Sequence, residues 1–505
     1  MKTLPDSARG FALVCAVCNA TAAFACDQVP AGQALWIRLT APVSTYTAKV
    51  GDPVHAVLTQ ELVCDNDVIF PMGTPIEGVV RSKSKVGWGI RHETAALEIE
   101  FNRAALAPDA VSFTARVGEV ENARESVRNG VIHGIRSTNT FQGSINSRLI
   151  HLPTWNPYSD TVLIAYKAVF PIFPEPEIYY PAGTDIRLRT TTEIASTPAT
   201  IEEPEASPAT ALEAERLDQV VAHLPVRVTT RKHVDADLLN IVLIGSEEQV
   251  RSAFHVAGWH NADPTSKNAW MKNLYALLNN SGYTQQPMMT FLLNDKPEDM
   301  NWQKNLNSYG RRDHLRSWHW TSPETNSTVW VTSSTRDTGA VLNVKAKGFI
   351  HHIAPDIDDE RSTVIRDLNF AGCVRSVSYI ARPQMPTVAR NAIGDVMRTD
   401  GDVAVITLQD CTSRNSQPDA SADTHSYRPG NYVFRYIRRQ ILTARNDIWR
   451  ANVIYAAYDV GRMTFQALRH SPPLSATPAD QQRPLDARVQ PSAIVDQTFF
   501  DVDPY

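Results

Sequence analysis

A stretch without large apolar side chains divides this chain into two globular parts. Residues 191–224 are rich in Pro, Ala, Thr and Glu, and the six acidic residues within 202–218 face a single arginine, Arg216. Such a segment cannot bury enough surface to offset the entropy of ordering it, which predicts an acidic, Pro-rich linker. The predicted fold class is therefore α+β and multidomain. A β-rich unit is predicted before the linker, at 33–190. A mixed α/β unit at 225–470 and a disordered tail at 471–505 are predicted after it.

The first 25 residues have the pattern of an export signal. Lys2 and Arg9 precede and open a short apolar stretch, and Ala23-Phe24-Ala25 fits a small-x-small cleavage site. This pattern predicts export to the periplasm or the outer cell envelope. Cys26 follows the predicted cleavage site directly, so a lipid anchor on this cysteine is an alternative that would tether the chain to a membrane.

Cleavage would leave four cysteines, and an exported chain can pair them. Cys26 and Cys64 belong to the β-rich unit, while Cys373 and Cys411 belong to the α/β unit. Pairing within each unit is one of three possible connectivities. Four buried or free thiols remain the alternative, because spacing alone does not decide between them.

The β-rich unit contains short runs typical of strands. Residues 97–101 alternate apolar and acidic side chains, as a half-buried strand does. Pro71-Met72-Gly73-Thr74 and Pro181-Ala182-Gly183-Thr184 repeat one pattern between β-forming residues. Because Pro presets the first position of a turn and Gly accepts a positive φ, both are predicted to be tight turns. The unit is expected to be a barrel or a sandwich.

Part of this unit resembles a known family. The segments 48–54, 70–74 and 76–80 are similar to the small β-barrel domain of type IV secretion and conjugal-transfer outer-membrane core proteins. The resemblance covers about 44–102 and rests on turn residues. It implies a β-barrel architecture and an envelope scaffold, and it does not imply a channel.

The second unit opens with a continuous apolar strand, residues 238–245. Ser246 follows as a predicted helix N-cap, with acidic residues in the first turn of the helix and Gly258 after its end. A strand, a cap and a helix in this order are typical of an α/β domain.

Several motifs of this unit resemble the LssY C-terminal domain family. They are Asn240 to Ser246, Ala257-Gly258-Trp259, Ala262-Asp263-Pro264, Arg311 to Trp318, and above all His351 to Arg361, so the similarity spans about 235–375. The activity of this family is unknown, and its members are often joined to membrane phosphatases of the phosphatidic-acid type. The resemblance therefore implies no catalytic residue.

Alternating residues from Arg312 to Trp320 form the first candidate site. On a strand, Arg312, His314 and Arg316 share one face, with Arg311 beside them, and this set of side chains suits an anion such as phosphate or carboxylate. The alternative is an ordinary strand face whose arginines pair with acidic residues elsewhere.

The second candidate site is the segment from His351 to Arg361. His351 and His352 are predicted to lie at the end of a strand and so to point to opposite faces, and Asp358 is predicted to be the N-cap of the following helix. One functional interpretation makes His351 or His352, with Asp356 and Glu360, a set of metal ligands or an acid–base pair. The other is a metal-free catalytic site, in which His351 or His352 meets His314 and the arginine face. The adjacent histidines lack the spacing of a helical metal pair.

Residues 432–468 are predicted to form one or two basic, amphipathic helices. Such a helix either packs on its own domain or lies on a membrane surface or partner. The formal net charge of −5 argues against a nucleic-acid partner.

Two functional hypotheses follow. In the first, the α/β unit binds or hydrolyses a phosphate-bearing envelope lipid or glycan, with Arg312, Arg316 and Arg311 holding the anion. In the second, the protein is a non-catalytic envelope scaffold or anion-binding module. The sequence assigns no metal, cofactor or oligomeric state.

Overall fold

The computed structural model describes most of the chain between residues 28 and 465. The gaps are 65–66, 89–91, 107–109, 137–139, 141–175, 196–210, 265, 322–327, 344–347 and 413–431, and beyond 450 only 457, 460, 461, 464 and 465 are described. The predicted signal, the candidate lipid-anchor residue Cys26 and the predicted tail at 471–505 lie outside the described residues.

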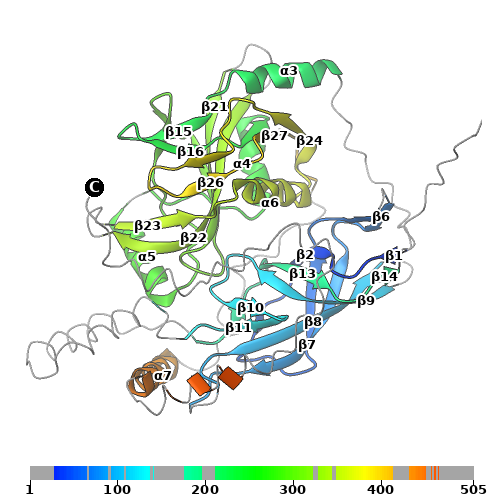
Figure 1. Cartoon of the computed structure of the whole chain (residues 1–505), viewed down its shortest axis with the longest axis vertical. Helices are drawn as coiled ribbons and strands as arrows, with labels where there is room; N and C mark the ends of the chain where they lie inside the picture. The colour runs from blue at the N-terminus through cyan, green and yellow to red at the C-terminus, as the bar shows by residue number, and fades with distance from the viewer. Residues whose placement is uncertain are drawn as a thin grey trace, which may run out of the picture.

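The first unit is a closed β-barrel of six strands (Figure 1). Its ring runs β8-β7-β4-β2-β13-β9 and closes through the pairing of β9 with β8. The strands are β2 (Ala34–Leu39), β4 (Pro53–Leu58), β7 (Pro75–Ser84), β8 (Ala96–Ala105), β9 (Ala110–Val120) and β13 (Asp185–Thr190). Shorter strands flank the ring: β1 (Gln28–Val29), β3 (Val43–Ser44), β5 (Leu62–Cys64), β6 (Asp67–Phe70), β10 (Ser126–Arg128), β11 (Val131–His133), β12 (Tyr179–Tyr180) and β14 (Ile194–Ala195).

The two Pro-x-Gly-Thr segments are tight turns, as predicted, and they occupy equivalent places in the barrel. Gly73 and Gly183 both have φ 87°. Their backbone N–H groups donate to the carbonyls of Leu58 and Leu39, which end neighbouring strands, at 2.8 Å each. Each turn therefore joins a short outer strand to a ring strand in the same way.

The second unit is built on a seven-stranded mixed sheet. Its order is β20-β21-β22-β17-β27-β24, with β23 also paired to β22, and only the pairing of β17 with β27 is parallel. The strands are β17 (Ile241–Ile244), β20 (Met300–Lys304), β21 (Arg312–Trp320), β22 (Val329–Asn343), β23 (Gly348–Ile353), β24 (Val374–Ala381) and β27 (Asp402–Leu408). A smaller sheet and a hairpin accompany it: β15 (Arg227–Thr230), β16 (Asp235–Leu238), β18 (Phe291–Leu293) and β19 (Lys296–Pro297), and β25 (Val388–Arg390) with β26 (Val396–Arg398).

Both faces of the large sheet are covered, which makes three layers. Helices α4 (Glu247–Val256) and α6 (Ile357–Phe370) pack on one face, and the small sheet lies over the other. Helix α5 (Lys267–Asn279) lies at the edge near β22 and β23 (Figure 1). Ser246 caps α4 through a complete capping box, as predicted.

The predicted linker is shorter than the sequence analysis placed it. Its last residues form helix α3 (Ala211–Ala222). Leu217, Val220 and Val221 are buried in the core of the second unit. The Ala, Leu and Glu residues that make this segment look like a linker also favour a helix, and three apolar side chains on one helical face are enough to dock it.

The C-terminal helix α7 (Tyr432–Arg450) packs on the barrel instead of the unit to which it was assigned. Leu442 belongs to the barrel core, and Arg438 donates to Glu177 at 2.6 Å. The boundary of the second unit at residue 470 is therefore wrong for this helix. None of the described helices is both long enough and apolar enough to span a membrane.

Cys373 and Cys411 form a disulfide, one of the pairings that the sequence allows. Cys64 is also disulfide-bonded. The Cys373–Cys411 bridge joins the end of α6 to the segment after β27 and so closes the edge of the second unit.

Candidate functional site

Strand β21 has a different polar cluster on each of its two faces. Arg312, His314 and Arg316 alternate along the strand and lie on one face, as the sequence predicts. Asp313 and Leu315 lie on the other face, where Leu315 packs in the core beneath α4 and α6 and Asp313 faces the barrel unit. All five residues are buried, so the predicted face is not a solvated surface.

Asp337 on β22 is the centre of the first cluster. Its register partner on β21 is Arg312, whose Nε donates to Asp337 Oδ2 at 2.6 Å. A second guanidinium nitrogen of Arg312 donates to Gln303 Oε1 at 2.9 Å. The positive charge of Arg312 is therefore already matched inside the protein. We call Asp337, Arg312, His314 and His351 the Asp337 cluster.

His314 is buried and neutral within this cluster. Its Nδ1 lies 3.7 Å from Asp337 Oδ1, and its Nε2 lies 3.2 Å from the Thr335 hydroxyl. Burial outweighs the nearby carboxylate and lowers the pKa of His314 to about 3. A histidine that stays uncharged at neutral pH and is almost completely buried is poorly suited to exchange protons with a substrate.

His351 reaches the same carboxylate from β23. Its Nδ1 lies 3.4 Å from Asp337 Oδ2, and its Nε2 lies 3.2 Å from the Gln286 side-chain nitrogen. Burial, and then the nearby Arg312, hold the pKa of His351 well below its ordinary value. The structure thus brings together His314 and His351, two of the predicted catalytic residues, around a carboxylate that the sequence analysis did not select.

Arg316 is also internally paired. Its guanidinium lies 3.9 Å from Asp237 on β16, 4.3 Å from the ring centre of Phe291, and it donates to the carbonyl of Met289. Burial raises the pKa of Asp237 to about 6, although Arg316 opposes the shift. Arg311 lies just before β21, where burial lowers its pKa and Glu119 on β9 opposes the shift.

His352 points to the other side of β23 from His351, as predicted. Its Nδ1 lies 2.8 Å from Asp395, a residue that the sequence analysis did not select. The hydrogen bond to Asp395 raises the pKa of His352 against partial burial. The His352 side chain is 36% exposed, so this pair is the more accessible of the two histidine sites.

Asp356 has a structural role at the start of α6, where the sequence predicted Asp358 as the N-cap. Asp356, not Asp358, is the N-cap of α6, and its carboxylate accepts from the backbone N–H of Asp358. Asp358 instead accepts from Thr399 and from the backbone of Asp400. The first turn of α6 therefore uses its acidic residues to hold the helix and the neighbouring loop in place.

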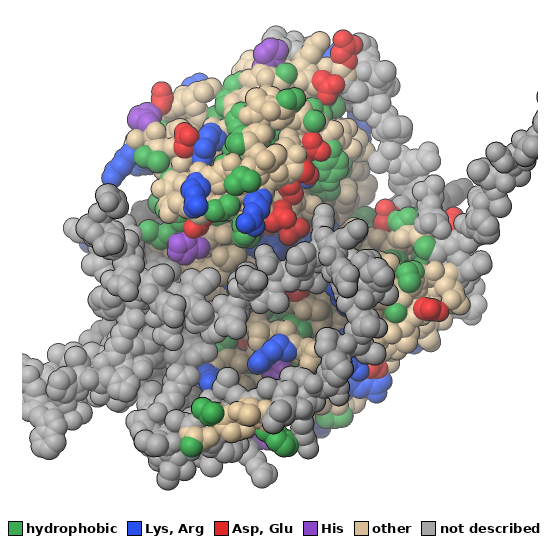
Figure 2. Space-filling view, in the orientation of Figure 1, with side chains coloured by type: hydrophobic (Ala, Val, Ile, Leu, Met, Phe, Trp, Pro, Cys, Tyr) green, Lys and Arg blue, Asp and Glu red, His purple; other side chains and the backbone are tan. Residues whose placement is uncertain are grey.

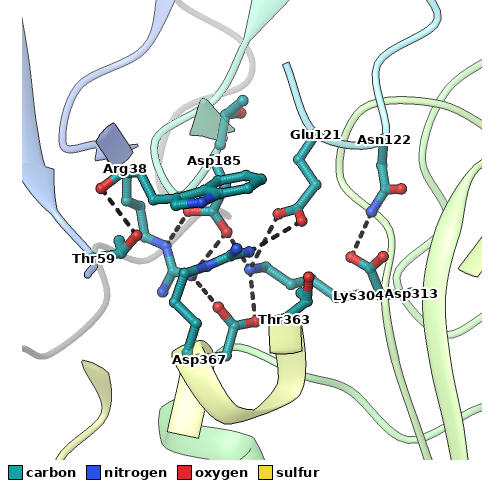
Figure 3. A network of polar contacts seen from close by, with 12 residues as sticks. Arg38, Thr59, Glu121, Asn122, Asp185, Lys304, Asp313, Thr363 and Asp367 are labelled. Carbon is teal, nitrogen blue, oxygen red and sulfur yellow. Dashed lines mark hydrogen bonds and ion pairs between the residues drawn. The ribbon is translucent and has the colours of Figure 1, made fainter. Parts of the chain in front are cut away.

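A larger polar cluster joins the two units, and the sequence analysis missed it (Figure 3). Arg38 of the barrel donates twice to Asp185 of the barrel, at 2.6 and 2.8 Å, and once to Asp367 of α6 at 2.8 Å. Lys304 of β20 donates to Asp185 and, at 2.9 Å, to the other Asp367 oxygen. Trp259 donates to Asp367 as well. The Arg38–Asp367 and Lys304–Asp185 ion pairs cross from one unit to the other, and all four side chains are buried.

The network continues through Glu121, which follows β9. Arg336 donates to Glu121 at 2.9 Å and to Asp313 at 2.7 Å, and Arg366 donates to Glu121 at 3.2 Å. Glu360 lies 3.3 Å from Arg336. We call the whole set the interdomain network: Arg38, Lys304, Arg336 and Arg366 with Asp185, Asp367, Glu121, Asp313 and Glu360.

The interdomain network contains four cations and five carboxylates. This excess of one negative charge affects the pKa values of the carboxyl groups. Burial works against the charge of Asp185, but Arg38 and Lys304 outweigh it and hold its pKa well below the ordinary value. Burial and then Asp313 raise the pKa of Glu121 to about 8. Burial and Asp313 also raise the pKa of Glu360. The excess negative charge therefore favours the protonated form of Glu121 and Glu360.

Asp337→Asn is expected to lower the free energy of unfolding by about 2–3 kcal/mol, because it leaves the buried Arg312 without its charge partner. Urea unfolding measures this loss. Asp235→Asn, which removes the exposed partner of Arg227, is the control and is expected to cost under about 1 kcal/mol. Equal losses in both variants would contradict a structural role for Asp337.

Within the described ranges, no group of three or more His, Cys, Asp or Glu side chains is arranged to hold a metal ion.

No curated protein matches the chain. The chain is similar to ComB10 of the Com type IV secretion system of Helicobacter pylori, with a TM-score of 0.19 and 11% identity over 33% of this chain and 89% of that one. Residues 221–403 match the family model described as LssY C-terminus. This range includes strand β21 and the Asp337 cluster.

Proposed function

We propose that this protein is a non-catalytic scaffold of the cell envelope, in which the barrel and the LssY-type unit act as one rigid body. The observation that carries the proposal is that two of the three predicted anion-binding arginines, Arg312 and Arg316, already have carboxylate partners inside the protein. Arg312 is paired with Asp337, and Arg316 lies against Asp237. A phosphate group would have to displace a buried carboxylate from each of them, which opposes binding.

The envelope location rests on two supports. The N-terminal residues have the pattern of an export signal, and the Cys373–Cys411 disulfide suits an oxidising compartment. The rigid-body part rests on the interdomain network, because buried ion pairs that cross between two units resist their separation.

The hydrolase alternative has one favourable observation, the partly exposed pair of His352 and Asp395. A carboxylate that holds Nδ1 of a histidine leaves Nε2 available as a general base. Assays with p-nitrophenyl phosphate, bis-p-nitrophenyl phosphate and phosphatidic-acid vesicles separate the two functions.

The scaffold proposal predicts that wild-type protein releases product no faster than His352→Gln, which removes this candidate base. His319→Gln is the matched control, because His319 is an exposed histidine on β21 outside both clusters. Phosphate or nitrophenol release by wild type and His319→Gln that His352→Gln lacks, with all three proteins folded by circular dichroism, would overturn the proposal.

A further inference from the structure

Helix α7 buries two arginines against the barrel and exposes four of its large apolar residues. Arg438 donates to Glu177, which is itself buried, and Arg445 donates to the carbonyl of Gly87. Both arginines are under 9% exposed, and Leu442 beside them is 2% exposed in the barrel core. These contacts fix one face of the helix on the barrel.

The adjacent face of α7 is apolar and exposed. Val433, Phe434, Ile437 and Ile441 lie on one stripe by their spacing, and between 48% and 59% of each residue's surface is exposed. We call these four residues the α7 stripe. Apolar side chains are visible on the surface near the position of α7 (Figures 1 and 2). A helix that buries two arginines and exposes four large apolar residues is the reverse of the usual arrangement in a soluble domain.

The barrel surface around α7 adds an exposed tryptophan and two lysines. Trp88 is 55% exposed and follows Gly87, the residue that accepts from Arg445. The Lys85 ammonium lies 4.8 Å from the ring centre of Tyr46, and the Arg438 guanidinium lies 5.5 Å from the same ring. Lys83 donates to the backbone of the neighbouring Thr45. Positive charge therefore gathers beside the α7 stripe.

The area and the charge of this surface favour a membrane over a second copy of the chain. Four side chains about half exposed offer on the order of 400 Å² per copy, so two stripes together would bury on the order of 800 Å², less than the roughly 1,200 Å² of a stable interface. The sequence of α7 carries five arginines and one acidic residue, Asp447; Arg438 and Arg445 are buried against the barrel, which leaves three further arginines against that one acid. Apolar residues on one face with basic residues elsewhere are typical of helices that lie in the surface of an anionic bilayer, where Trp is a common anchor.

We propose that the α7 stripe and Trp88 form a membrane-docking surface for an anionic lipid bilayer. The helix lies in the interface, with its apolar side chains among the lipids and the barrel above them. This inference goes beyond the scaffold proposal, since it names the surface that would hold the scaffold at a membrane. Failure of vesicle binding would leave the assays with the two soluble nitrophenyl phosphates unchanged, so the two proposals can fail separately.

The test is co-sedimentation of the full chain with vesicles. Wild-type protein is expected to sediment with vesicles of phosphatidylglycerol and phosphatidylcholine, and much less with phosphatidylcholine alone. Ile437→Asn/Ile441→Asn is expected to weaken binding by about tenfold or more, because two apolar side chains no longer enter the lipid. Val388→Asn/Ile393→Asn changes two exposed aliphatic residues of the second unit in the same way and is expected to bind as wild type does.

Three results would overturn the proposal. They are absence of wild-type binding to anionic vesicles, equal binding by both double variants, and a wild-type dimer in light scattering that Ile437→Asn/Ile441→Asn dissociates. Circular dichroism and urea unfolding of each variant establish that a loss of binding does not come from a loss of fold.

Discussion

Arg38→Met is expected to lower the free energy of unfolding by about 3–5 kcal/mol. Arg38 is fully buried in the barrel and holds Asp185 within its own unit and Asp367 across the domain boundary. Methionine fills much of the same volume but carries no charge. The two carboxylates would then share only the Lys304 ammonium in a region that excludes water, and the network would have five carboxylates for three cations.

The loss can be measured by urea unfolding of the full chain, followed by both tryptophan fluorescence and far-ultraviolet circular dichroism. The two signals are expected to coincide in wild type and to separate in Arg38→Met, because the contact that couples the units is weakened. Arg103→Met is the matched control: Arg103 is also on a barrel strand, but its pair with Glu77 is exposed, so a loss under about 1 kcal/mol is expected. Equal losses in the two variants would show that the interdomain network does not stabilise the fold.

Local sequence patterns predicted the elements of the fold better than their assignment to units. The Pro-x-Gly-Thr turns and the Ser246 cap are determined by residues within a few positions of each other, and the structure confirms them. Helices α3 and α7 were misassigned because composition does not indicate which surface a helix packs against. Leu217 meets the second unit and Leu442 meets the barrel, and those contacts exist only in the folded chain.

The candidate site was predictable on one strand but not across strands. Alternation placed Arg312, His314 and Arg316 on one face, but their acidic partners come from other strands. One signal was present in the sequence, since Ser333, Thr335 and Asp337 alternate in the same way and face β21 in the sheet. The interdomain network had no such signal: Arg38 and Asp367 are 329 positions apart, and nothing local predicts that they meet.

Glu121→Gln is expected to change how the stability of the protein depends on pH. Burial raises the pKa of Glu121 from an ordinary value of 4.5 to about 8, so the folded protein keeps a proton that the unfolded chain has already lost. The stability from this protonated carboxyl is complete below about pH 4.5 and is lost as the pH rises toward 8. Glutamine is neutral at every pH, so the variant is not subject to this loss and leaves four carboxylates for four cations.

The free energy of unfolding of Glu121→Gln minus that of wild type is therefore expected to rise by about 2–4 kcal/mol as the pH increases from 5 to 8. Urea unfolding at pH 5, 6.5 and 8 measures this change. His314 and His351 have lowered pKa values and add stability as the pH rises to about 6.5, but they are present in both proteins and cancel in the difference. Glu77→Gln makes the same chemical change at an exposed glutamate outside the network. If the difference between Glu121→Gln and wild type is the same at all three pH values, Glu121 is ionised throughout, and the excess proton of the network belongs to another carboxyl.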